Sequence, residues 1–186
     1  QYAIQQLTAA KYAENYGNIE DATKYYENYR KAIDATKESL DAYLEEYDSL
    51  YDHANTMMDL DENLTSIQKE FGARELQAYQ SQQAYEYRTK YAEELSNMLR
   101  DLSEAMGDNV DIINNATEAL ARYNEEIKGV NVNSKEYKTL QTQIANATKE
   151  REAALQNIAI LDKDTTRIER LVVENNRERE KLNIIR

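Results

Sequence analysis

Residues 124–144 read NEEIKGVNVNSKEYKTLQTQI and interrupt a chain that is otherwise rich in helix-forming residues. Gly129 is the residue type that most often follows the C-terminus of a helix, and Ser134 is a favoured N-cap residue. The four residues between them alternate valine with asparagine, which favours a connection over a helix. We therefore predict a turn at residues 129–134.

The composition of the chain favours long helices. Its 186 residues include no proline, no cysteine and only four glycines, while 31% are charged. A compact fold with many turns normally draws more heavily on glycine and proline. We predict an all-α protein, built as an elongated coiled coil of long helices. The absence of cysteine also excludes a disulfide scaffold and a thiolate zinc site.

Apolar residues recur at seven-residue intervals along most of the chain. From Ala22 to Ile127, every seventh residue is apolar or aromatic except Thr36. A companion stripe lies three or four residues away, and new stripes begin after the turn at Tyr137 and Leu140. Two stripes at this spacing are the a and d positions of a coiled coil. The residues that we expect to form helix interfaces are Ile33, Leu40, Tyr47, Leu50, Leu64, Ile67, Leu99, Leu102, Met106, Ile113, Leu120, Ile127, Leu140, Ile144, Leu161 and Ile168.

The two sides of the predicted turn match when the chain is folded back on itself. Ala116 then faces Ala147, and Leu102 faces Leu161. Short connections usually join antiparallel helices that are neighbours in space. We therefore predict an antiparallel helical hairpin. Asn175 falls on the seam of its second helix, where a buried polar residue fixes the register of a coiled coil.

The glycines suggest the other boundaries. We expect Gly17 to separate a short N-terminal helix, residues 1–17, from a long Tyr-rich helical segment, residues 18–128. This segment should continue through Gly72 and Gly107, because the apolar stripe keeps its phase at both. A single glycine costs only about 1 kcal/mol against alanine inside a helix, so it need not end one.

Two parts of the chain complete the expected organisation. Residues 135–186 form a C-terminal coiled-coil helix. Within the long segment, residues 73–91 carry only half a seam, because the companion stripe there passes through Arg74, Ser81 and Arg88. We expect this region to be the weakest-packed part and a joint.

The charge and the apolar pattern limit the partners. The net charge is −12, whereas nucleic-acid binding relies on clustered Lys and Arg, so we expect no specific nucleic-acid binding. No stretch approaches the roughly 18 uncharged apolar residues of a membrane span. We expect neither a membrane span nor a cofactor.

The side chains that often carry chemistry are sparse. His53 is the only histidine, so no histidine pair or zinc cluster can form. Residues 59–70, DLDENLTSIQKE, partly match a calcium loop, but Leu64 stands where such a loop needs glycine. Because Leu64 and Ile67 fit the helical seam, we expect a helix there. We predict no catalytic or metal site, and no enzyme.

The opening stretch also resembles a known family. Lys128–Gly129, the Val-Asn turn, SKEYKTLQTQI (134–144) and ANATKERE (145–152) are similar to the coiled-coil hairpins of bacteriophage tail tape measure proteins. The resemblance covers residues 124–160. It implies an elongated, homo-oligomeric helical protein inside the tail of the virion, whose length sets tail length and which leaves with the genome. It brings no catalytic residues.

A second functional hypothesis stays open. The same seams suit a cytoplasmic coiled-coil scaffold or adaptor that binds partner helices. In either case the expected partners are other copies of the chain or partner helices of structural proteins. Because residue 1 is Gln, we expect the sequence to be a fragment or a processed chain.

Overall fold

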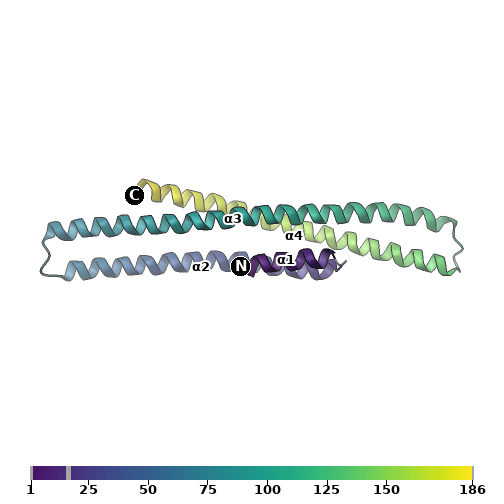
Figure 1. Ribbon diagram of the computed structural model, residues 1–186, viewed down its shortest axis with the longest axis horizontal. Coiled ribbons are helices and arrows are strands. Elements are labelled where there is room, and N and C mark those ends of the chain that lie inside the picture. Colours follow the sequence, from purple (N-terminus) through teal and green to yellow (C-terminus); the bar gives the residue numbers. More distant parts are fainter. Residues whose placement is uncertain (1, 16–17, 186) are drawn as a thin grey trace. The chain divides into compact units, whose positions relative to one another are not determined.

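The computed structural model describes residues 2–15 and 18–185, and these are helical apart from short connections (Figure 1). The long helices contain 42, 61 and 51 residues, so each extends for tens of ångströms at about 1.5 Å per residue. This confirms the predicted all-α class with long helices. The helices in the described residues are α1 (Tyr2–Asn15), α2 (Ile19–Leu60), α3 (Ser66–Glu126) and α4 (Lys135–Ile185), with a 3₁₀ turn at Ile127–Gly129.

The chain forms two compact units, and each unit is built from two separate segments. Unit 1 comprises Gln1–Ile33 and Leu99–Arg167, and unit 2 comprises Asp34–Met98 and Ile168–Arg186. The three long helices therefore each contribute to both units, and the unit boundaries lie within helices. The sequence had suggested consecutive helical segments, whereas the units combine residues that are far apart in the chain.

The core of unit 1 combines small and large apolar residues. Its alanines let helix backbones approach closely, and the larger side chains fill the spaces between them. The buried residues include Ala10, Ala22, Tyr26, Ile33, Leu102, Ala105, Ala154 and Leu161.

The predicted hairpin is confirmed: α3 and α4 run in opposite directions from the turn that joins them (Figure 1). The Ser134 Oγ accepts a hydrogen bond of 3.0 Å from the Tyr137 N–H, which is the N-cap contact expected for serine. The Asn131 Oδ1 accepts one of 2.9 Å from the Asn133 N–H, forming an Asx turn. Gly129 ends the 3₁₀ turn.

A second reversal, at residues 61–65, was not predicted (Figure 1). The Asn63 N–H donates to the Asp61 Oδ1 at 2.9 Å, so the loop contains an Asx turn. Thr65 and Gln68 then form a capping box: the Gln68 N–H donates to the Thr65 Oγ1 at 3.3 Å, and the Thr65 N–H donates to the Gln68 Oε1 at 2.8 Å. These side chains start α3.

This turn corrects the single segment predicted over residues 18–128, which α2 and α3 divide between them. The seven-residue stripe keeps its phase across the loop, and for that reason it concealed the break. Leu64 is half-buried in the loop, and the Ile67 side chain is 79% exposed, so neither belongs to a continuous seam.

The other predicted boundaries have different outcomes. The α3 helix continues through Gly72 and Gly107, as expected, and also through residues 73–91. Gly17 lies outside the described residues, which begin again at Asn18. The Asn18 carbonyl accepts the Ala22 N–H at 3.2 Å and so begins the hydrogen-bond ladder of α2.

In unit 2, tyrosines form much of the contact between α2 and α3. The Tyr43 and Tyr87 rings stack with centroids 3.6 Å apart, and the Tyr51 and Tyr79 rings meet edge to face at 6.0 Å. Residues 73–91, which lack a second apolar stripe in the sequence, therefore pack against α2 through aromatic rings.

Candidate functional site

The predicted interface residues divide into three groups by burial. Six are buried between helices: Ile33, Leu40, Leu102, Leu140, Leu161 and Ile168. Eight are half-buried: Tyr47, Leu64, Leu99, Met106, Ile113, Leu120, Ile127 and Ile144. Leu50 and Ile67 are exposed in this chain, so their predicted part in a helix interface stays a prediction.

Unit 1 contains a buried cluster of polar side chains on α1, α2 and α3. The Tyr26 hydroxyl donates to the Glu14 Oε1 at 2.7 Å, and the Asn109 Nδ2 donates to the same oxygen at 2.7 Å. The Asn109 Nδ2 also lies 3.2 Å from the Tyr26 hydroxyl oxygen, which accepts from it. One carboxylate oxygen thus joins three helices.

The cluster extends to α4 through a second asparagine. The Asn157 Nδ2 donates to the Asn109 Oδ1 at 3.3 Å, and the Thr23 hydroxyl donates to the Asn157 Oδ1 at 2.6 Å. We call Glu14, Thr23, Tyr26, Asn109 and Asn157 the polar layer of unit 1. Because hydrogen bonds need matched positions, this layer favours one register among the four helices.

Burial is the main electrostatic influence on this layer. It raises the pKa of Glu14, while the hydrogen bonds from Tyr26 and Asn109 lower it and only partly compensate. Burial also raises the pKa of Tyr26, and its hydrogen bond to Glu14 adds to the rise. Among the described residues, the buried Glu14 Oε2 has no hydrogen-bond partner, so ionisation of Glu14 is costly.

A second polar contact of unit 1 joins α2 to α4. The Arg30 Nε donates to the Asp164 Oδ1 at 2.6 Å, and the Asp164 side chain is only 1% exposed. The carboxylate of Asp164, together with that of Asp101, contributes to the raised pKa of Tyr29, whose largest cause is burial. This ion pair fixes the same helices at another level.

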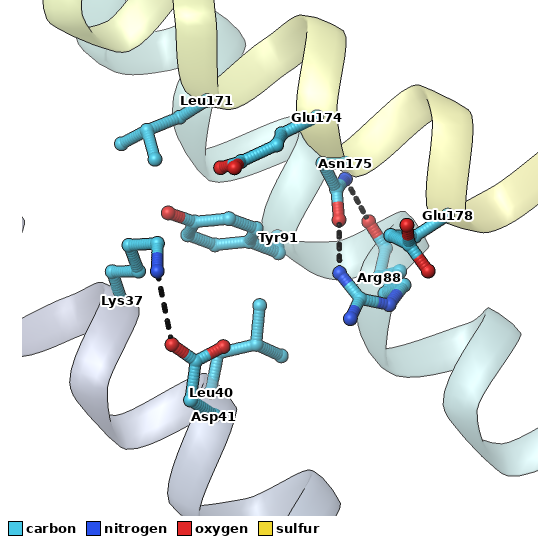
Figure 2. Close-up of a pocket in the computed structure, with 9 residues that line it drawn as sticks. All are labelled: Lys37, Leu40, Asp41, Arg88, Tyr91, Leu171, Glu174, Asn175 and Glu178. Atoms are coloured by element: carbon cyan, nitrogen blue, oxygen red, sulfur yellow. Dashed lines mark hydrogen bonds and ion pairs between the residues drawn. The ribbon is translucent and has the colours of Figure 1, made fainter.

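Unit 2 contains a hollow of about 200 Å³ between α2, α3 and α4 (Figure 2). The Arg88 Nη1 donates to the Asn175 Oδ1 at 3.3 Å, and the Asn175 Nδ2 donates to the Arg88 carbonyl at 2.8 Å. On the α2 side, the Lys37 Nζ lies 3.0 Å from the Asp41 Oδ2. Asn175 is buried, as its position on the predicted seam implied.

Tyr91 lies at the centre of this hollow, between side chains of α2 and α4 (Figure 2). Its hydroxyl is buried without a hydrogen-bond partner in the described part of the chain. Burial, followed by the carboxylates of Asp41, Glu94 and Glu174, raises the pKa of Tyr91 to about 12. The hydroxyl therefore stays protonated at neutral pH.

The cations that line the hollow have partners on α2 and α4. Lys37 pairs with Asp41 on its own helix, α2, and Arg88 bonds to Asn175 of α4. His53 is exposed on α2. Among the residues that the structure describes, no three His, Cys, Asp or Glu side chains converge as metal ligands would.

The sequence contained a signal for the polar positions that were missed. Asn109 stands seven residues from both Leu102 and Ala116, in phase with the seam. Asn157 and Asp164 are likewise seven residues apart, and both are buried. A polar residue in phase with an apolar stripe is therefore a candidate for a buried register-fixing contact. Glu14 had no such signal, because its burial depends on how α1 packs.

Comparisons with known proteins found no matching family model, curated protein or solved structure. Within the described ranges, none of the helices combines the length and the apolar content that crossing a lipid bilayer requires.

Proposed function

We propose that this protein is a structural component of a bacteriophage tail, related in role to the tape measure proteins, and that it acts by packing its long helices against other helices. The observation that carries the proposal is the α3–α4 hairpin, whose helices are held in register by buried asparagines. The stretch that resembles tape measure proteins lies at the turn of this hairpin.

The polar contacts support a structural role over a catalytic one. Buried polar groups at helix interfaces add little net stability, but they penalise every register that leaves them unpaired. Asn109 and Asn175 each bond to a residue of another helix. A protein that repeats in an assembly benefits from such uniqueness, because every copy must present the same surface.

The test is to locate and count the full-length chain in its native particle. Purified tails should contain it internally, in a copy number that follows tail symmetry, three or six per particle, by quantitative mass spectrometry. Recovery of the chain only as a soluble cytoplasmic dimer would overturn the proposal.

That second outcome would favour a coiled-coil scaffold or adaptor. One observation speaks for this alternative: α2 and α3 of unit 2 expose several large apolar side chains, as proteins that bind partner helices do.

A further inference from the structure

The α2–α3 hairpin of unit 2 exposes several large apolar side chains on its helices, among them Leu50, Met57 and Phe71. Leu50 and Met57 are each 57% exposed, and Phe71 is 63% exposed. Single exposed apolar residues are common, but a group of them on one face marks an interaction site. The question is whether these three share a face.

The contact between the two helices supplies the reference direction. Tyr51 of α2 meets Tyr79 of α3. Met58 of α2 lies against Gly72 of α3 so closely that a Cβ at Gly72 would collide with its sulfur. Tyr51, Met58 and Gly72 therefore point into the α2–α3 contact.

Each exposed residue comes directly before one of these contact residues in the chain: Leu50 before Tyr51, Met57 before Met58, and Phe71 before Gly72. One residue is a rotation of about 100° around a helix. When two antiparallel helices contact each other, the residue just before a contact residue lies on the same side of the plane through the two helix axes in both helices. Leu50, Met57 and Phe71 thus form one surface, the Leu50–Met57–Phe71 face.

The fourth helix does not cover this face. In unit 2, α4 contacts α3 through Arg88, which bonds to Asn175. Arg88 follows Tyr87, whose ring stacks on Tyr43 of α2. A residue that follows a contact residue rotates to the opposite side of the hairpin from one that precedes it, so α4 lies on the other side.

Acidic residues surround the face. Residues 45–75 hold nine Asp and Glu against two basic residues, Lys69 and Arg74. Both are already engaged: Lys69 donates to the Asp59 carbonyl, and Arg74 pairs with Glu70 at 2.6 Å. The surroundings of the face are therefore strongly negative.

Two of these acids border the face itself. Glu46 lies one turn before Leu50, and Glu75 one turn after Phe71, so each shares a side of its helix with the apolar residue. Both are exposed.

We propose that the Leu50–Met57–Phe71 face binds an amphipathic helix of a partner protein that presents apolar residues flanked by Lys and Arg. Apolar side chains along the groove between two antiparallel helices can pack against a third helix. The carboxylates at the border favour a third helix that carries Lys and Arg. A second copy of the chain fits less well, because it would bring the same nine acids against these nine. The proposal concerns a different surface from the α3–α4 hairpin and does not depend on the tail location.

The test uses the whole chain and three synthetic 18-residue probes in a fluorescence anisotropy titration. The first is an amphipathic Leu/Lys helix, the second replaces Lys by Glu, and the third scrambles the Leu/Lys sequence. We expect only the first to bind, with an affinity that falls as salt rises. Equal binding of the Glu probe or of the scrambled probe would overturn the proposal.

Variants locate the binding. Phe71→Gln and Met57→Gln should each weaken binding of the Leu/Lys probe tenfold or more. The matched control is Val173→Gln on α4, a side chain of similar exposure, 59%, outside the face. Circular dichroism should show unchanged helix content, since all three side chains are exposed. An equal loss in the control, or no loss in the face variants, contradicts the proposal.

Sedimentation of the chain without a probe tests whether a second copy of the chain covers the face instead. A dimer that Phe71→Gln dissociates would mean that a second copy covers the face, and the proposal would be wrong. A failure of either test leaves the particle experiment for the proposed function unaffected.

Discussion

At the scale of single residues, Glu14 shows how a polar group can be both necessary and costly. Its Oε1 receives hydrogen bonds from Tyr26 and Asn109, whereas its buried Oε2 has no hydrogen-bond partner in the part of the chain that the structure describes. The layer therefore accepts an oxygen at this position but does not need a full negative charge. The hydrogen bonds to Oε1, which hold the helices in place, and the negative charge of the carboxylate are therefore separate properties of Glu14. A substitution can remove the charge and keep the acceptor oxygen.

Glu14→Gln should stabilise the protein at neutral pH. The pKa of Glu14 is raised on folding, so its ionisation disfavours the folded state. Below the unfolded pKa both states are protonated and the penalty is absent; it grows as pH rises toward the folded pKa. We expect the variant to be more stable than the natural protein at pH 7, and the difference to shrink as the pH falls toward 4.

Urea denaturation of both proteins at pH 4 and pH 7 measures this. The difference in stability should grow with pH. If the difference in the free energy of unfolding were the same at both pH values, ionisation of Glu14 would not destabilise the folded state.

Asn109→Ala should destabilise the protein by roughly 2 kcal/mol, because it leaves the buried Asn157 Nδ2 without its hydrogen bond to Asn109 and takes one of two donors from the Glu14 Oε1. Asn114→Ala on the exposed side of α3 is the matched control and should change stability little. Chemical denaturation compares them. Similar losses in both variants would remove the case for a polar layer at Asn109.

At the scale of elements, the two turns show why one was predictable and the other was not. At residues 129–134, glycine, asparagine and serine differ visibly from the helical sequence on either side. At residues 61–65, the apolar stripe stays in phase, so periodicity gave the wrong result. The correct signal was local. The Thr-x-x-Gln capping box at Thr65 marks the start of a helix, even though the seven-residue spacing of apolar residues continues across the loop.

Thr65→Ala tests this cap. Loss of the Thr65 hydroxyl removes the acceptor for the Gln68 N–H and should cost about 1 kcal/mol. Thr65→Ser keeps the hydroxyl and is the control. The measurement is the urea midpoint, together with hydrogen exchange in the first turn of α3. An unchanged midpoint for the alanine variant would show that other contacts start the helix.

The glycines of α3 provide a second prediction. A Cβ at Gly107 meets no atom within 4 Å, so Gly107→Ala should stabilise the protein by up to about 1 kcal/mol through helix propensity. Gly72→Ala should gain less, because its Cβ forces Met58 to move. Thermal unfolding by circular dichroism ranks the two variants. The opposite ranking would contradict the close α2–α3 contact.

At the scale of the whole molecule, charge and helix content were predictable, whereas the composition of the two units was not. The apolar stripes that include Leu102 and Leu161, both buried, correctly predicted that α3 and α4 pair. Which segments combine into a unit depends on the unpredicted turn at residues 61–65 and on how α1 packs. Long-range partners such as Glu14 and Asn109 are separated by 95 residues.

The net charge gives a prediction at this scale. With a net charge of −12, repulsion among carboxylates opposes folding, and salt screens it. Raising NaCl from 20 mM to 500 mM should therefore raise the thermal midpoint by a few degrees. A midpoint that falls with salt would indicate that exposed ion pairs such as Lys11–Glu104 dominate instead.

The interleaving of the two units has a consequence for dissecting the gene. A single truncation from either end cannot isolate unit 1, because its segments flank residues 34–98. An internal deletion can: joining Ile33 to Leu99 through a short loop makes unit 1 contiguous. A stop codon placed before Leu99 would instead remove residues 99–167 from unit 1 and residues 168–186 from unit 2 at once.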